Sequence, residues 1–186
     1  MLIDSTQSFL LIVDMQEKLV PALRQSENLV HNIGSLAMAA DLLHLPTWAT
    51  EHCAERIGGT VAQISSHLSP DLILQKTHFC AAKEPEVLMR LSEMGRRQAI
   101  ICGAEAHVCV LQTALGLLQH GYDVALVADA SGTRHVGNYR LAIERLRQAG
   151  CQVVSCEMVL FEWLERADQA AFKTLLPIIK SLKTID

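Results

Sequence analysis

Three side chains of complementary chemistry stand at or just beyond the ends of apolar runs in this sequence. Asp14 ends the run FLLIVD, Lys76 ends DLILQK, and Cys109 opens a helix-like stretch after QAIICG. A thiol in the first turn of a helix lies near unpaired backbone N–H groups and the positive end of the helix dipole, which predicts a pKa below its ordinary value. A neighbouring carboxylate can accept the thiol proton, and an ammonium can stabilise the resulting charge. The predicted chemistry is nucleophilic attack by the Cys109 thiol.

Each of these residues also has a structural explanation when it is considered alone. Asp14, followed by MQEK, could cap a short helix. Lys76 could be a solvated strand end, and Cys109 could fill space in the core, as free cysteines commonly do. The placement of all three at one edge of a predicted sheet favours a functional site.

The elements that must position these residues alternate along the chain. Right-handed crossovers between successive strands would join them into a mostly parallel sheet with helices on both faces. The predicted fold is therefore three-layer α/β/α, with a doubly wound six-stranded sheet in one domain spanning residues 1–186. Expected strands cover 9–14, 46–51, 71–76, 98–103, 123–129 and 151–156, and expected helices cover 27–44, 84–94, 107–119, 137–148 and 168–182. The segment 52–70 fits neither pattern and is expected to be a long irregular loop.

Charge and cysteine usage exclude several classes of partner. Sixteen basic and twenty acidic residues give a formal net charge of −4 without a basic block, so neither nucleic acid nor a membrane surface is expected. The N-terminal MLIDSTQSFLLIVDMQ predicts a strand, because its apolar run is short and interrupted by an Asp. Six cysteines without a CxxC pair indicate reduced thiols, and we expect a cytoplasmic protein with a small-molecule substrate.

Four segments carry a resemblance to a known family. They are LLIVDMQ at 10–16, TEHCAERIGGT at 50–60, LQKTHFCA at 74–81 and CGAEAHVCVLQTALGLLQHGYDVALVADASGTR at 102–134. In this order, and over nearly the whole chain, they resemble the isochorismatase-like hydrolases. This cysteine hydrolase superfamily includes nicotinamidases and N-carbamoylsarcosine amidase.

The resemblance implies roles for individual residues. Asp14, Lys76 and Cys109 match the family's triad of base, charge stabiliser and nucleophile. The family's non-proline cis peptide falls at Ala104–Glu105. The backbone N–H groups of Glu105 and Cys109 would then form the oxyanion hole.

Differences from family members narrow the expected reaction. Nicotinamidases bind a metal through an Asp-x-His stretch, whereas this chain reads ATEHCAERIGG, so we expect neither a metal nor a cofactor. True isochorismatases typically lack the nucleophilic Cys, so Cys109 favours hydrolysis of an amide or related C–N bond through a thioester. Two alternatives stay open. One is isochorismate-type vinyl ether hydrolysis using Asp14 and Lys76, and the other is a non-catalytic binding or oligomeric scaffold.

Further residues near the triad are candidates for the substrate pocket or for packing. Asp129 is expected to be a structural cap, and Cys80 is expected to be a buried thiol. The apolar C-terminal segment AAFKTLLPIIKSL offers a face for a homo-oligomer, as is common in the family. The tentative pocket residues are Gln16, His52, His78, Phe79 and His107.

Overall fold

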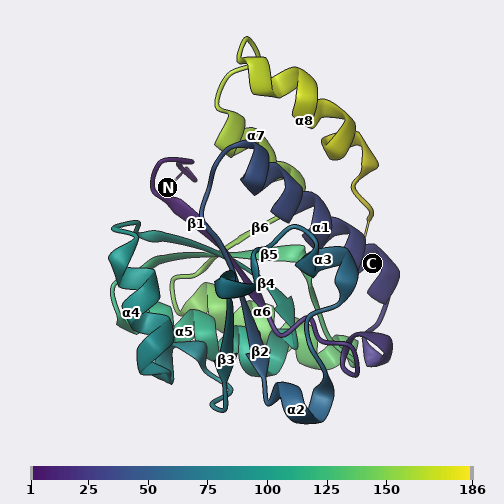
Figure 1. Cartoon of the computed structure of the whole chain (residues 1–186), viewed down its shortest axis with the longest axis vertical. Helices are drawn as coiled ribbons and strands as arrows, with labels where there is room; N and C mark the ends of the chain where they lie inside the picture. Colours follow the sequence, from purple (N-terminus) through teal and green to yellow (C-terminus); the bar gives the residue numbers. More distant parts are fainter. Residues whose placement is uncertain (1, 185–186) are drawn as a thin grey trace.

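The computed structural model describes residues 2–184, in which six parallel strands form one sheet in the order β3-β2-β1-β4-β5-β6. The predicted α/β three-layer fold is thereby confirmed (Figure 1). The strand order reverses direction between β1 and β4, and α/β sheets bind ligands beyond the carboxyl ends of their strands at such a point. The strands are β1 (Ser8–Val13), β2 (Thr47–His52), β3 (Ile73–Lys76), β4 (Gln98–Ala104), β5 (Asp123–Gly132) and β6 (Gln152–Val154).

Helices cover both faces of this sheet. Figure 1 shows α1, α7 and α8 on one side and α4, α5 and α6 on the other. A π-helical turn, Ala106–Val110, leads into α5. The helices are α1 (Ser26–Leu42), α2 (Ala54–Ile57), α3 (Ala62–Ser65), α4 (Pro85–Glu93), α5 (Leu111–Gln119), α6 (Val136–Gln148), α7 (Cys156–Leu164) and α8 (Ala170–Ser181).

The central strands are buried on both faces, which explains their uninterrupted apolar sequences. Every residue of β1 is buried. Leu10 and Ile12 pack toward α1 and α7, whereas Leu11 and Val13 pack toward α4 and α5. Each face therefore has its own hydrophobic core, and β1 is held firmly between the two.

Strand register brings the predicted triad to one edge of the sheet. Val13, the last residue of β1, pairs with Thr50 of β2 and with Gly103 of β4. Asp14 therefore leaves β1 between these two neighbours. Strand β3 ends at Lys76 on the same edge, beside the end of β2.

Two sequence-based expectations about the elements were wrong. The sixth run was expected to be strand through residue 156, but Cys156 begins helix α7, which the pattern did not reveal. The buried residues of α7 do recur at helical spacing, at 156, 159, 160, 163 and 164, but the exposed Met158 and Phe161 are also apolar and hide the amphipathic pattern in the sequence. The segment 52–70 is not one irregular loop, because it contains α2 and α3 and is anchored by the fully buried Ile64.

None of the helices in residues 2–184 has both the length and the apolar composition needed to cross a membrane.

Gly103 is predicted to be essential to the close packing of β4 against the end of β1. Its φ is +120°, and a Cβ there would overlap the Val13 carbonyl oxygen and lie 2.7 Å from Val13 N. We expect Gly103→Ala to destabilise the protein by at least about 2 kcal/mol, since β1 and β4 would have to separate. Urea unfolding measures this. Gly137→Ala, in α6 where a Cβ has open space, is the matched control. Equal stability of the two variants would contradict the prediction.

Candidate active site

Asp14 and Lys76 form a buried ion pair at this edge. Lys76 Nζ lies 2.7 Å from Asp14 Oδ2, and the two residues are 2% and 1% exposed. Removing either charge from water costs several kcal/mol, which their mutual attraction and additional hydrogen bonds must offset. The geometry of this pair is therefore tightly constrained by its neighbours.

Thr50 holds Asp14 at two points. The backbone N–H of Asp14 donates to the Thr50 carbonyl oxygen at 3.0 Å, and Thr50 Oγ1 donates to Asp14 Oδ1 at 2.8 Å. Asp14 adopts a left-handed backbone conformation, with φ of 50°, which is uncommon outside glycine but tolerated by Asp. The contacts from β2 offset the cost of this conformation and aim the carboxylate.

Lys76 is fixed by the segment that follows it. Its Nζ donates to the carbonyl oxygens of His78 and Phe79 at 3.2 and 3.4 Å. These two carbonyls hold the ammonium beside Asp14 and satisfy buried N–H groups that would otherwise be costly.

The same segment is tied down by Glu84. Its Oε1 accepts hydrogen bonds from the backbone N–H groups of Thr77 and His78 at 2.8 and 2.9 Å. The N–H groups of His78 and Thr77 stabilise the charged carboxylate and lower the pKa of Glu84 to about 2. The His78 ring also contacts Glu84, at 2.9 Å, and its side chain is 53% exposed. The structure thus places the His78 side chain at the surface, while its carbonyl serves Lys76.

The sequence predicted that Cys109 lies in the first turn of a regular α-helix. The structure places it in the π-helical turn instead. It is only 7% exposed. Burial, the largest effect, and the negative charge of Asp14 raise the pKa of the Cys109 thiol to about 12, although Lys76 acts in the opposite direction. The expectation of a lowered thiol pKa was therefore wrong, because burial beside a carboxylate outweighs the helix dipole.

This charge arrangement affects how a thiolate can form. Loss of the thiol proton to solvent would place two negative charges beside one ammonium. Transfer of that proton to Asp14 instead leaves one negative and one positive charge in the cluster. Since like charges in a dry site repel strongly, the arrangement favours transfer within the cluster.

The peptide bond between Ala104 and Glu105 is cis. The Glu105 carbonyl accepts hydrogen bonds from the N–H groups of Val108 and Val110, which shapes the π-helical turn around Cys109. The Glu105 carboxylate lies 3.1 Å from Arg134 Nε and also accepts from the Arg134 backbone N–H. The side chain of Glu105 thus joins the end of β4 to the segment after β5, while the oxyanion role of its N–H stays a prediction.

Three of the tentative pocket residues lie together on the β2 side. Gln16 is fully buried; its Nε2 donates to the carbonyls of His52 and Gly58, and its Oε1 accepts from the His52 N–H. The rings of His52 and Phe79 are stacked, with centroids 5.0 Å apart and an interplanar angle of 26°. Phe79 is 51% exposed. Gln16 therefore organises the backbone after β2, and the His52–Phe79 pair presents an aromatic surface.

His107 lies within the π-helical turn, two residues before Cys109. Its Nδ1 is 3.1 Å from the Thr133 hydroxyl, so the ring links this turn to the end of β5. The contact found for His107 is therefore with the end of β5 and not with the His52–Phe79 pair.

Thr50 and Arg134 were missed in the sequence. Thr50 is an ordinary β-branched strand residue by type, and only its register opposite Val13 reveals that its hydroxyl reaches Asp14. Arg134 follows β5 and meets Glu105 only in the fold. Strand β2 reads TWATEH and contains other polar residues, so the sequence offered no signal that singled out Thr50.

The contacts of Asp129 and Cys80 indicate structural roles for both residues. Asp129 lies within β5 and not at its end, and its Oδ1 accepts from the Cys156 N–H at 2.7 Å, which caps α7. Cys80 is buried against Gly116 of α5, where a Cβ would come 2.7 Å from its sulfur. Within residues 2–184, no cluster of three or more His, Cys, Asp and Glu side chains is arranged to hold a metal ion.

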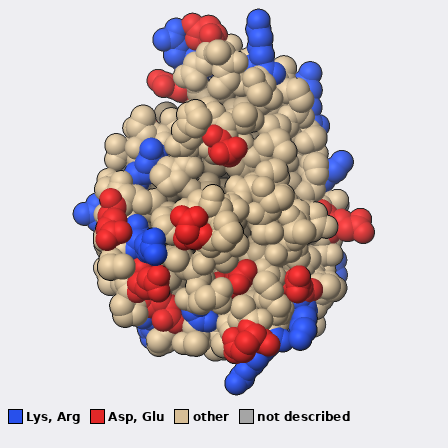
Figure 2. All heavy atoms as spheres, in the orientation of Figure 1, with Lys and Arg blue, Asp and Glu red and all other residues tan. Residues whose placement is uncertain are grey.

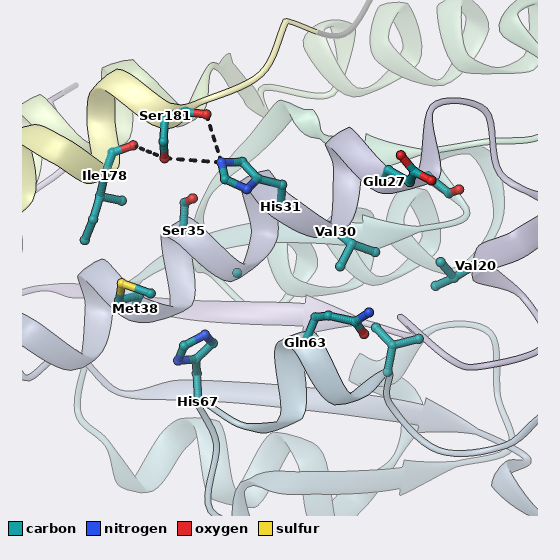
Figure 3. A pocket seen from close by; sticks show the side chains of 13 residues that line it. Val20, Glu27, Val30, His31, Ser35, Met38, Gln63, His67, Ile178 and Ser181 are labelled. Carbon is teal, nitrogen blue, oxygen red and sulfur yellow. Dashed lines mark hydrogen bonds between the residues drawn. The ribbon is translucent and has the colours of Figure 1, made fainter.

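A separate cavity of about 490 Å³ lies between α1, the α3 region and α8 (Figure 3). His31 Nε2 is 2.8 Å from the Ser181 carbonyl oxygen at its upper rim. Its lining includes Met38, Gln63 and His67 but none of the triad residues. This hollow is therefore distinct from the Asp14–Lys76–Cys109 cluster.

The comparison with known protein families agrees with this geometry. The isochorismatase domain model matches residues 8–158. The chain belongs to the isochorismatase domain family. Among curated relatives, the secreted isochorismatase effector Isc1 of Phytophthora sojae is 36% identical over 178 residues, covering 93% of this chain and 84% of the relative.

Solved structures share the isochorismatase fold. A MAR1 ribonuclease from Caenorhabditis elegans is 30% identical, with a TM-score of 0.92 and coverage of 99% of this chain and 95% of that one. YcaC from Escherichia coli, described as an octameric hydrolase of unknown specificity, is 26% identical, with a TM-score of 0.89 and coverage of 97% and 94%. YcaC from Pseudomonas aeruginosa, solved with hexane-2,5-diol and covalent acrylamide, is also 26% identical, with a TM-score of 0.89 and coverage of 97% and 95%.

The buried Asp14–Lys76 ion pair predicts how the stability of this isochorismatase domain changes when one of its charges is removed. Lys76→Met leaves the Asp14 carboxylate buried without its counter-charge, so we expect a loss of about 3–5 kcal/mol. The double variant Asp14→Asn/Lys76→Met should recover much of that loss. Urea unfolding at neutral pH measures both, with Lys180→Met, at an exposed position in the last turn of α8, as the control. A single variant as stable as this control would contradict the account.

Proposed function

We propose that this member of the isochorismatase family is a cysteine hydrolase that cleaves an amide or related C–N bond of a small molecule. The observation that carries the proposal is a buried thiol that lies beside a buried carboxylate–ammonium pair, whose two charges act on the thiol in opposite directions. This cluster stands where the strand order reverses, beyond the carboxyl ends of β1, β3 and β4. An ion pair with a purely structural role would not require a thiol next to it, whereas a nucleophilic site would.

In the proposed reaction, Asp14 accepts the Cys109 proton as the sulfur attacks the carbonyl carbon. The C=O bond becomes a C–O⁻ bond in the tetrahedral intermediate, which Lys76 and the N–H groups of Glu105 and Cys109 stabilise. The C–N bond then breaks, and Asp14 returns the proton to the leaving amine. Water, deprotonated by Asp14, attacks the thioester, releases the carboxylic acid and restores the thiol.

The burial of the cluster supports a small substrate. Cys109 is 7% exposed, so a reacting carbonyl must enter a confined space. The stacked rings of His52 and Phe79 offer an aromatic surface for a planar group. The P. aeruginosa YcaC structure holds covalent acrylamide, which is itself a small amide and an acceptor for nucleophiles.

Charge distribution argues against RNA as the substrate of this chain, although the C. elegans neighbour is called a ribonuclease. Proteins that bind nucleic acids use clustered Lys and Arg to neutralise phosphates. This chain has a formal charge of −4, and the face in Figure 2 shows Lys and Arg interspersed with Asp and Glu. We therefore propose a small-molecule substrate.

Assembly and location are also proposals. The octameric E. coli YcaC, similar over 97% of this chain, supports a homo-oligomer. All six cysteines are free thiols, and we propose on this basis a reducing compartment such as the cytoplasm. The P. sojae relative is called secreted, so location must be tested by fractionation.

The test is ammonia release from a panel of small primary amides, together with peptide mass analysis of acid-quenched enzyme. We expect a thioester on Cys109 and a fall in kcat of about 10³-fold or more in Cys109→Ala, because the nucleophile is removed. Cys151→Ala, which removes a buried thiol next to β6, should retain the wild-type rate.

Three results would overturn the proposal. An unchanged rate in Cys109→Ala on a confirmed amide would exclude the thiol as nucleophile. Cleavage of a vinyl ether that persists in Cys109→Ser would favour isochorismate-type hydrolysis. A lack of acylation and of turnover across both substrate classes would favour a non-catalytic scaffold.

A further inference from the structure

The two oxygens of the Asp14 carboxylate have different surroundings. Oδ1 accepts a hydrogen bond from the fully buried Thr50 hydroxyl at 2.8 Å. Oδ2 lies 2.7 Å from Lys76 Nζ, yet within residues 2–184 no group meets it in a hydrogen-bonding direction. Oδ1 therefore accepts a directed hydrogen bond, whereas neither lone pair of Oδ2 receives one from the described residues.

A second buried carboxylate, Glu51 in β2, provides a contrast. Glu51 accepts from the Thr60 N–H and hydroxyl through Oε1 and from Gln75 Nε2 through Oε2. Both of its oxygens are satisfied, as is usual for a carboxylate with a structural role. The unequal satisfaction of Asp14 is therefore not a general property of acidic residues at this edge.

We propose that Thr50 is a positioning residue that engages Asp14 Oδ1 and thereby presents Oδ2 as the acceptor of the Cys109 proton. This inference rests on the proposed cysteine hydrolase function. Thr50 also fixes the Asp14 backbone through its carbonyl, so both the chain and the side chain of the base are held from β2. A valine would fill nearly the same space but could not donate the hydrogen bond.

The choice of threonine at a fully buried strand position supports this role. Burying a hydroxyl among apolar neighbours is unfavourable unless it finds a partner, and here that partner is the charged Asp14. Thr47, at the start of the same strand, instead donates to the Leu45 backbone carbonyl at 3.4 Å. Thr47 is thus a matched position whose hydroxyl contacts no acid.

The experiment measures acylation of Cys109 by 4-nitrophenyl acetate between about pH 4 and pH 8 in Thr50→Val, Thr50→Ser and the control Thr47→Val. The coloured 4-nitrophenolate gives the rate, and peptide mass analysis identifies the acylated residue. We expect Thr50→Val to slow acylation about tenfold at neutral pH, which is the typical effect of losing one hydrogen bond to a charged group.

The pH profile separates positioning from a loss of packing. In Thr50→Val the charged carboxylate lacks a stabilising donor, so the acidic limb of the rate should move up by about one pH unit. Thr50→Ser restores a hydroxyl and should keep the wild-type limb, as should Thr47→Val. If Thr50→Val fails to fold, Thr50→Ala replaces it in the comparison with Thr50→Ser.

Two outcomes would overturn the inference in different ways. Acylation of Cys109 with the same rate and limb in Thr50→Val and Thr47→Val would refute the role of Thr50 and leave the hydrolase proposal standing. Equal release of 4-nitrophenolate by wild type and Cys109→Ser would refute the nucleophile itself, and with it any base for Thr50 to position.

Discussion

The structure of this edge depends on one constraint, the burial of the Asp14 carboxylate against the Lys76 ammonium. Two charges can be kept out of water only if their geometry is good and their remaining hydrogen-bonding groups are satisfied. The Thr50 hydroxyl and the carbonyls of His78 and Phe79 supply those contacts from β2 and from the segment after β3. Cys109 lies beside this ion pair, and the charges of Asp14 and Lys76 favour transfer of the thiol proton to Asp14 over its loss to solvent.

The rest of the fold serves to keep these groups in register. Because β1 is buried between two hydrophobic cores, Asp14 cannot shift along the sheet without disturbing both. Gly103 lets β4 approach Val13 closely, and the π-helical turn beyond it carries Cys109 back toward Asp14. The position of the site therefore follows from strand order and from close backbone packing more than from any single loop.

Much of this arrangement was predictable from the sequence, and the failures have physical causes. Alternating apolar runs and helical patterns were sufficient for the parallel sheet, and the charged residues ending those runs indicated the edge at which Asp14 and Lys76 meet. Helix α7 was missed because its exposed face also carries the apolar residues Met158 and Phe161, which hide the contrast between a buried and a solvated side. The thiol pKa was predicted in the wrong direction because the helix dipole is visible in a sequence, whereas burial and the distance to Asp14 are properties of the fold. Thr50 was missed for the same reason, since its importance lies in its pairing opposite Val13.

The most direct test of the central claim is the thiolate absorbance of Cys109 as a function of pH, obtained by subtracting the spectrum of Cys109→Ser. Burial and Asp14 keep the pKa of this thiol near 12, so wild type should show no Cys109 thiolate below about pH 10. Asp14→Asn should lower the pKa of the thiol, because burial still raises it but the negative charge of Asp14 no longer does, while amide turnover is lost with the base. A wild-type thiol that already ionises near neutral pH, or one whose titration is unchanged in Asp14→Asn, would contradict the account.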